Sequence, residues 1–242
     1  MQRKQFKDDL IILKRFTINE NDILVNAFGR FSGKIQLKAK GSKKILSKFT
    51  GRLEPLSIIS AEIYDSGKSY TLTNANLKFC PLGIQESNYE TYELSQKICG
   101  ILNRFLPFEE PNAKIFHLIE RIAEQYTIEQ NINKTEIFFL TKFLEFSGFL
   151  PSFSFCHDCH EKFDQNPFTN SDLIFICPKC LPNSNNSNIN HEFQEVNLNT
   201  LKLLNYITTC KKPADLRPLK IPVNNNDQAR LILNRLTNHL SS

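Results

Sequence analysis

The sequence lacks the features that mark membrane proteins, secreted proteins and several classes of enzyme. No apolar run approaches the roughly 18 residues that a membrane span requires. The apolar run near the N-terminus lasts only from Leu10 to Leu13, which is too short for a secretory signal peptide. There is no Gly-rich phosphate loop and no G-x-S-x-G elbow. We therefore expect a cytoplasmic protein that is not an enzyme.

Two further enzyme patterns are absent or weak. A zinc deaminase needs H-x-E ahead of P-C-x-x-C, whereas His160 and Glu161 are adjacent here and Ile176 precedes Cys177. The pair Asp8-Asp9 is the remaining candidate for a catalytic metal site, but an acidic pair at the start of a strand is normally an ordinary surface feature. We expect no catalytic residues.

Acidic residues are missing from one long interval. None lies between Asp22 and Glu54, while the same interval carries eight basic residues. These are Arg30, Lys34, Lys38, Lys40, Lys43, Lys44, Lys48 and Arg52. Elsewhere the charges are mixed: residues 1–80 hold 15 Lys or Arg and 7 Asp or Glu (+8), residues 81–155 hold 6 and 10 (−4), and residues 156–242 hold 9 and 8 (+1). The uneven balance indicates separate modules with different partners.

The basic interval predicts a nucleic-acid interface. From residue 34 to residue 40, Lys34, Gln36, Lys38 and Lys40 alternate with apolar residues, so a β-strand would place these four on one face, with successive positions about 6 to 7 Å apart. Such a row suits a phosphate backbone, where released counterions provide affinity without sequence preference. Phe28, Phe31 and Phe49 lie nearby in the sequence; we expect each of them to belong to the core, with stacking on bases as the alternative. The competing interpretation is a solvated face in a lysine-rich sequence.

Four of the seven cysteines form a metal-binding pattern. Cys156, Cys159, Cys177 and Cys180 are spaced C-x2-C-x17-C-x2-C. Four thiolates at this spacing close a tetrahedron around one Zn²⁺, which leaves no position for water or substrate. We expect one structural zinc per chain. Disulfides, a redox pair and a metal-free remnant are the alternatives. We expect His157 and His160 to be solvent-exposed residues of the knuckle, with substitution as a ligand as the alternative.

The first eighty residues predict five short strands. The strands are expected at 8–15, 22–28, 34–40, 56–64 and 69–79, separated by turn residues. Five strands at this spacing favour a small OB-like barrel, with an SH3-like barrel as the alternative.

Beyond residue 87 the apolar period becomes helical. Helices are expected from about Ser87 to Pro107, after Pro111 to Tyr126, and at 134–147, 197–209 and 227–240, with residues 182–190 a polar loop and residues 211–223 extended. The predicted fold class is α+β. Its expected parts are an OB-fold DNA-binding domain (1–80), a helical bundle (81–150), a zinc module (151–181), and a loop with C-terminal helices that pack on the helical domain (182–242).

Several short motifs in this order resemble the RecO family of bacterial DNA repair and recombination proteins. They are Ile11-Ile12-Leu13-Lys14, Glu20-x-Asp22, Gly33-Lys34, Lys38-Ala39-Lys40-Gly41, Gly51-x-Leu53-x-Pro55, the segment LPFEEP at 106–111, and Gly148-Phe149-x-Pro151 just ahead of Cys156. The resemblance covers nearly the whole chain to about residue 180 and is looser afterwards.

The resemblance implies a function as well as a fold. It implies a non-catalytic recombination mediator, located at the bacterial nucleoid, that binds single- and double-stranded DNA and anneals complementary strands. It also implies that the protein acts with RecR to load RecA onto DNA coated by single-strand-binding protein, whose acidic C-terminal tail it contacts. The alternative function is a zinc-ribbon adaptor between proteins, with an incidental basic barrel.

Overall fold

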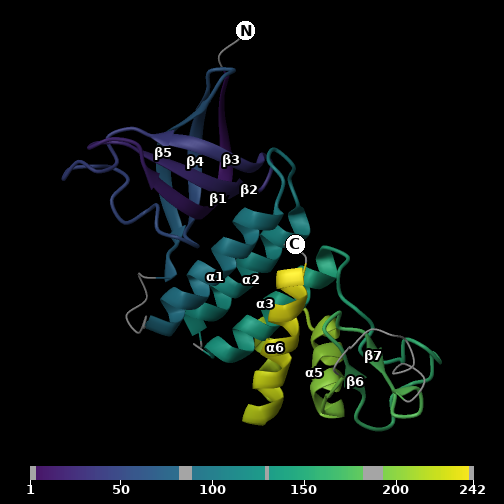
Figure 1. The fold of residues 1–242 in the computed structure, drawn as a ribbon. Coiled ribbons are helices and arrows are strands. Elements are labelled where there is room, and N and C mark those ends of the chain that lie inside the picture. The colour runs from purple at the N-terminus through teal and green to yellow at the C-terminus, as the bar shows by residue number, and fades with distance from the viewer. Residues whose placement is uncertain (1–3, 82–88, 129–130, 182–192, 240–242) are drawn as a thin grey trace. The chain divides into compact units, whose positions relative to one another are not determined.

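The computed structural model of the chain contains a closed barrel of five strands in its N-terminal part (Figure 1). The strands are β1 (Lys4–Thr17), β2 (Ile23–Gly29), β3 (Gly33–Ala39), β4 (Ile58–Asp65) and β5 (Tyr70–Phe79). Their order around the barrel is β1-β2-β3-β5-β4, and β4 pairs with β1 to close it. The prediction of an OB-like barrel with five strands is confirmed.

The structure describes residues 4–81, 89–128, 131–181 and 193–239. The predicted loop at 182–190 lies outside these residues. The chain divides into two compact units, Met1–Ile132 and Asn133–Ser242, which are treated separately below. The finer division into four parts stays a prediction.

Strand β1 serves two neighbours. Residues 4–11 pair with β4, residues 10–17 pair with β2, and the register with β2 shifts between Ile12 and Lys14. A bulge at such a shift bends a strand and increases its twist. The bend lets one strand close both sides of the barrel.

Alternating apolar residues fill the barrel. Leu10 and Ile12 of β1 and Ile35 and Leu37 of β3 point inward and are at most 1% exposed. Phe49, from the segment between β3 and β4, joins the same core. Buried alternation of this kind fixes the register, since a slip by one residue would turn the apolar face outward.

Two helices complete the first unit. They are α1 (Tyr89–Phe105) and α2 (Ala113–Ile128). The thiol of Cys99 on α1 donates to the carbonyl oxygen of Ile12 at 3.4 Å, and burial raises its pKa to about 12. The segment between the helices reaches β3, where the Glu109 amide donates to the Lys34 carbonyl oxygen at 2.9 Å. Helices and barrel are therefore joined by direct hydrogen bonds.

The second unit combines helices with a small sheet. Its elements are α3 (Ile132–Phe146, whose first residue belongs to the first unit), β6 (Phe168–Thr169), β7 (Phe175–Ile176), β8 (Gln194–Glu195), α5 (Leu198–Thr209), the 3₁₀ helix η2 (Pro213–Leu216) and α6 (Val223–His239). The sheet order is β7-β6-β8, and α5 packs against α6 (Figure 1).

The predicted helices are found, with one correction between the last two. Residues 211–223 are not extended throughout, because η2 interrupts them and α6 already begins at Val223. The carboxylate of Asp215 accepts from the amides of Lys211 and Lys212 at 2.8 and 3.1 Å. A side chain that caps backbone amides in this way stabilises a short helical turn. The three prolines of the segment favoured an extended prediction instead.

Candidate metal centre and nucleic-acid interface

The two C-x-x-C pairs of the second unit meet at one point. The sulfur atoms of Cys156, Cys159, Cys177 and Cys180 all lie within 4.8 Å of one another. Two sulfurs bound to one zinc at about 2.3 Å stand about 3.8 Å apart at the tetrahedral angle. The Sγ atoms of Cys159 and Cys177 are 3.8 Å apart, far beyond the roughly 2.0 Å of a disulfide. The cluster has the dimensions of a site that holds a metal ion.

Backbone amides prepare the cluster for thiolates. The Cys177 amide donates to Cys156 Sγ at 3.3 Å. Burial alone would raise the pKa of Cys156, but the amides of Cys159, Cys177 and Asp158 outweigh it and bring that pKa to about 7. The pKa of Cys180 is raised, chiefly by its hydrogen bond with the Cys177 thiol. Four thiols this close cannot all ionise alone, and a cation among them removes that conflict.

The two histidines lie outside the cysteine cluster, as expected for exposed residues of the knuckle. His157 and His160 are exposed, and His157 Nδ1 lies 3.1 Å from the carboxylate of Asp158. His160 has a positive φ of 58°, and its amide donates to the Cys156 carbonyl oxygen at 3.1 Å, so it closes the turn of the first knuckle. The four cysteines are sufficient as ligands.

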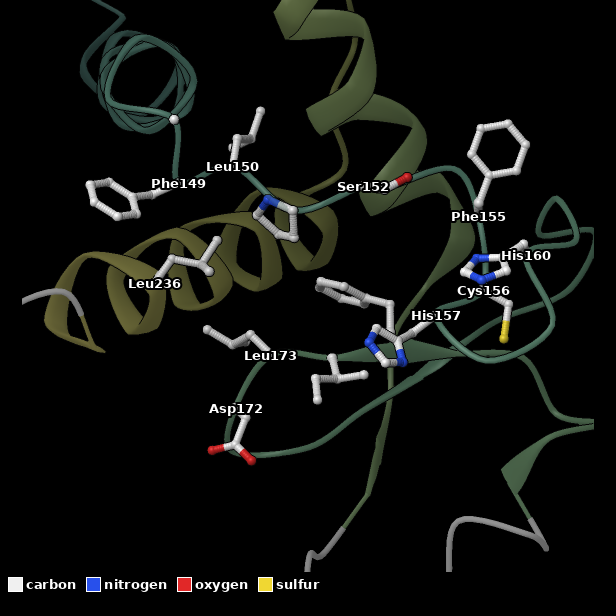
Figure 2. Close-up of a pocket in the computed structure, with 14 residues that line it drawn as sticks. Phe149, Leu150, Ser152, Phe155, Cys156, His157, His160, Asp172, Leu173 and Leu236 are labelled. Atoms are coloured by element: carbon white, nitrogen blue, oxygen red, sulfur yellow. The ribbon is translucent and has the colours of Figure 1, made fainter.

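An open pocket of about 520 Å³ lies beside the cysteine cluster. Figure 2 shows it between residues 148–152, the knuckle at 156–160, the turn around Leu173, and Leu236 of α6. Phe149 and Phe155 are 53% and 49% exposed, which leaves large apolar surfaces in the pocket. The pocket suits an apolar side chain, with His157, His160 and Asp172 as its polar groups.

The barrel carries the second candidate site, on the outer face of β2 and β3. The cross-strand pairs on this face are Phe28 with Lys34, Asn26 with Gln36, and Leu24 with Lys38. The part near Lys34 is covered by residues of the helical segment. The part from Gln36 to Lys40 is open.

Lys34 is the main correction to the predicted row of lysines. It is only 5% exposed, so the expectation that it stands in solvent with Lys38 and Lys40 is wrong. Its ammonium donates to the Asn103 carbonyl oxygen at 3.0 Å and lies 4.3 Å from the centre of the Phe108 ring. Burial lowers its pKa. Lys34 does lie on the same strand face as Lys38, but a segment some seventy residues later in the chain covers this end of the strand.

Arg30 is also held by internal partners. Its Nε lies 3.6 Å from Asp9, its NH2 pairs with Glu120 on α2, and its guanidinium stacks 4.5 Å from the Phe116 ring centre. A guanidinium that is engaged on both edges and one face joins the barrel to α2. Asp9 of the barrel and Glu120 of the acidic middle region thus neutralise this one charge.

The other six predicted residues form the accessible basic surface. Lys38, Lys40, Lys43, Lys44 and Lys48 are exposed, while Arg52 is half-buried. Lys48 and Arg52 donate to the carbonyl oxygens of Thr73 and Ala75 on β5. Among the residues that the structure describes, Lys38, Lys40 and Lys43 have no ion-pair partner. We call these six residues the basic surface.

Sequence reasoning missed Lys68, which joins this surface from the turn between β4 and β5. Parallel pairing of β3 with β5 aligns Lys38 with Thr71, and a pocket of about 510 Å³ includes both Lys38 and Lys68. Tyr70 and Phe108 line the same pocket. The only signal in the sequence was the barrel topology, since the two lysines are far apart along the chain.

The expectations for the three phenylalanines and for Asp8 have different outcomes. Phe28 and Phe49 are buried, which confirms that they belong to the core, whereas Phe31 is 76% exposed and is the one of the three that is free to stack on a base. Asp8 is not a surface residue: it is 4% exposed and accepts hydrogen bonds from the amides of Phe31 and Ser32. Asp8 stabilises the β2–β3 turn.

No helix within the described residues is long and apolar enough to cross a membrane. The barrel order and the cysteine cluster together define an OB-fold protein with an attached helical part and a metal-type module.

Comparisons with known proteins identify the family. Residues 1–80 match the family model for the N-terminal part of recombination protein O, and residues 86–241 match the model for its C-terminal part. The chain belongs to the RecO family, and its function is in DNA repair and recombination. The resemblance seen in the sequence is confirmed.

Individual relatives agree over most of the chain. The DNA repair protein RecO of Thermodesulfovibrio yellowstonii is 27% identical over 179 residues, which cover 72% of this chain and 70% of the relative. The protein of the same name from Caldanaerobacter subterraneus is 24% identical over 208 residues, 85% of this chain and 81% of the relative. That of Dehalococcoides mccartyi is 27% identical over 209 residues, 84% and 78% respectively.

Proposed function

We propose that this chain is a recombination mediator that binds single- and double-stranded DNA through its basic surface, without sequence preference. The observation that carries the proposal is the open part of β3 and the segment after it, where exposed lysines follow one another without an intervening acid. Each phosphate that a lysine neutralises releases counterions, and this term does not depend on sequence. Lysines offer few of the bidentate guanine contacts that arginine makes, so base readout is weak.

Lys68 extends the proposed DNA path beyond the residues predicted from the sequence. It lines the pocket that also contains Lys38, Tyr70 and Phe108. Asp65 and Glu109 line it as well, and Glu109 accepts a hydrogen bond from the Tyr70 hydroxyl at 3.0 Å. Lys38 and Lys68 would contact a phosphate of a bound nucleotide, and the aromatic rings would contact its base.

Arg30 and Lys34 would contribute to the proposed interface indirectly. Their side chains bind residues of the helical segment and so hold the barrel in place for DNA binding.

We further propose that the protein anneals complementary strands and, with RecR, helps to load RecA onto DNA coated by single-strand-binding protein, whose tail it contacts. Family membership supports these roles. We place the protein at the bacterial nucleoid for the same reason, because its DNA is there. The protein would act by binding alone: four cysteines around an ion leave no position for a reacting water.

The ion that fits the cysteine cluster is zinc, one per chain. Four sulfur ligands at tetrahedral spacing favour zinc among the common divalent ions, because thiolates are soft ligands and the geometry is tetrahedral. Its role would be structural, to hold the two knuckles together.

Salt dependence of DNA binding tests the proposed interface. The triple variant Lys38→Ala/Lys40→Ala/Lys43→Ala should flatten the slope of log K against log salt by about 3, roughly one unit for each lost phosphate contact. Lys162→Ala/Lys202→Ala is the control, because both lysines are exposed but lie in the other unit. An unchanged slope in the triple variant would remove the basic surface from the interface.

A second candidate function is a protein adaptor, and the pocket of Figure 2 favours it. The pocket would take an apolar side chain of a protein partner. Absence of any DNA binding at low salt, together with partner binding that is lost in Phe149→Asp, a change at an exposed residue of the pocket, would support this function over the first.

A further inference from the structure

Two large aliphatic side chains project from the basic surface with nothing to pack against. Ile45 and Leu46 are each 97% exposed. The Ser47 amide donates to the Lys44 carbonyl oxygen at 2.9 Å, so Ile45 and Leu46 are the central residues of a β-turn. The centre of a turn normally carries Pro, Gly, Asn, Asp or Ser, because these residues favour the turn dihedral angles or form hydrogen bonds with the turn backbone. Ile and Leu do neither.

The turn is anchored on both sides. On one side, the Gly41 amide donates to Asp22 at 2.7 Å, and the Lys43 amide donates to the Asn21 carbonyl oxygen at 3.1 Å. On the other side, Phe49 is buried in the barrel core and the Lys48 ammonium donates to β5. A projection held in this way presents its side chains at little cost in conformational entropy on binding.

Cations surround the apolar tip. Lys43, Lys44 and Lys48 flank it in sequence, and all three are exposed. Asp22 and Glu54 are acids of this region, and Glu54 is paired with Arg15 at 2.6 Å. Lys40 and Lys44 are among the groups that lower the pKa of Asp22, after the Gly41 amide and Asn19. The tip is thus an apolar point within a positively charged region.

A pocket of about 580 Å³ lies next to the tip. Its lining includes Lys43, Lys44 and Ile45 on one side and Phe16 and Ile23 of the barrel on the other. Phe16 is 39% exposed, with Lys14 positioned 5.0 Å from its ring centre. Apolar walls with cations at the rim match a nucleobase that has left its stack but remains joined to phosphates.

We propose that Ile45 and Leu46 form a wedge that inserts between neighbouring bases of bound DNA, while the flanking lysines hold the phosphates on either side. DNA-bending proteins insert Ile, Leu, Met or Phe between base steps in the same chemical arrangement, and the insertion partly unstacks the step. The inference rests on the proposed DNA-binding function and adds to it: the protein deforms the DNA at a defined point.

Fluorescence of 2-aminopurine tests the wedge, because stacking quenches this base and unstacking releases its emission. The probe is placed at the junction of a duplex with a single-stranded tail, and the full-length protein is added to saturation. Wild type should raise the emission several-fold. Ile45→Ser/Leu46→Ser should not, and its affinity should fall by about tenfold, as for the loss of one base-stacking contact. Its salt slope should be unchanged, because no charge is altered.

The matched control is Leu77→Ser/Leu231→Ser, which removes two exposed leucines elsewhere, 45% and 50% exposed. It should behave as wild type. Wild-type protein that binds DNA with a strong salt dependence but leaves the probe quenched would overturn the wedge alone. Wild-type protein that binds no DNA would overturn the proposed function and the wedge together. Binding to anionic lipid vesicles that requires Ile45 and Leu46, with the DNA probe still quenched, would assign the tip to membranes and overturn the proposal.

Discussion

The barrel and the cysteine module solve the same problem, holding a small sheet together, by different means. The barrel has five strands around a cluster of buried side chains that runs from Leu10 on β1 to Ala75 on β5. The module has strands of only two residues each, and Phe153 and Phe175 are its main aromatic contact. Two-residue strands cannot stabilise a sheet. The barrel folds by burying apolar surface, and we propose that the module depends on a metal ion held by its four cysteines.

Removal of the metal should produce the largest difference in stability between the barrel and the cysteine module. Chelation should unfold residues 151–181 and leave the barrel folded, because the binding energy of a structural zinc, about 10 kcal/mol or more, is also the folding energy of its module. Hydrogen exchange measured before and after chelation checks this. Loss of protection in β1–β5 would contradict it.

Thiol reactivity supplies the control for that experiment. The four cysteines of the cluster should become reactive on chelation, whereas Cys99 should remain inert, since burial raises its pKa to about 12. Reaction of Cys99 would mean that the first unit had opened as well.

A cavity in the barrel core should destabilise the barrel and leave the metal site intact. Leu37 is fully buried in the barrel core, so Leu37→Ala should lower the free energy of unfolding by about 2 to 5 kcal/mol. Metal content should stay the same. Urea denaturation and elemental analysis measure the two quantities, with the half-exposed Leu231→Ala as the control, expected to change stability by about 0.5 kcal/mol or less. A loss of metal in Leu37→Ala would show that the regions depend on each other.

Gly33 tests how far the barrel depends on the segment between α1 and α2. It has a φ of +68°, and an added Cβ would lie 2.5 Å from backbone atoms of Glu110. Gly51 has a nearly equal φ of +69° with nothing within 4 Å of an added Cβ. Gly51→Ala should cost about 1 kcal/mol of stability from backbone strain alone, and Gly33→Ala about 3 kcal/mol because the clash is added. Equal losses in the two variants would mean that the segment does not press on the barrel.

The smallest expected effect is a pH dependence at Lys34. Burial lowers its pKa below the ordinary 10.5. In the window just below pH 10.5 the unfolded chain therefore binds a proton at Lys34 that the folded chain has released, and stability gains from this group as the pH rises through the window. Lys34→Met should lack this gain in denaturation curves compared between neutral pH and that window. If the stabilities of the two proteins change equally between these pH values, Lys34 is exposed to solvent in the folded protein.

The sequence predicted the features whose cause is local. The alternation in residues 34–40 predicted a strand, and Ile35 and Leu37 do point into the barrel. The cysteine spacing predicted a cluster, because each C-x-x-C turn brings its two sulfurs together without help from the rest of the chain. Five strands and the main helices followed from periodicity in the same way.

The features that failed depend on residues far away in the chain. Lys34 and Lys38 are equivalent by alternation, but Asn103 and Phe108 cover only Lys34. Lys68 reaches the basic surface only because β5 pairs with β3. Neither effect depends on the neighbouring sequence. Both could be predicted only once the three-dimensional arrangement of the barrel was known.

The double pairing of β1 has a consequence for synthesis on the ribosome. Residues 4–9 pair with β4 and not with β2, and β4 ends at Asp65. At about 5 to 20 residues per second, this first part of β1 remains unpaired for several seconds while the intervening segment is synthesised. During this interval one edge of the nascent sheet is unpaired, and the charged residues Lys4, Lys7, Asp8 and Asp9 along it would discourage contact with neighbouring nascent chains.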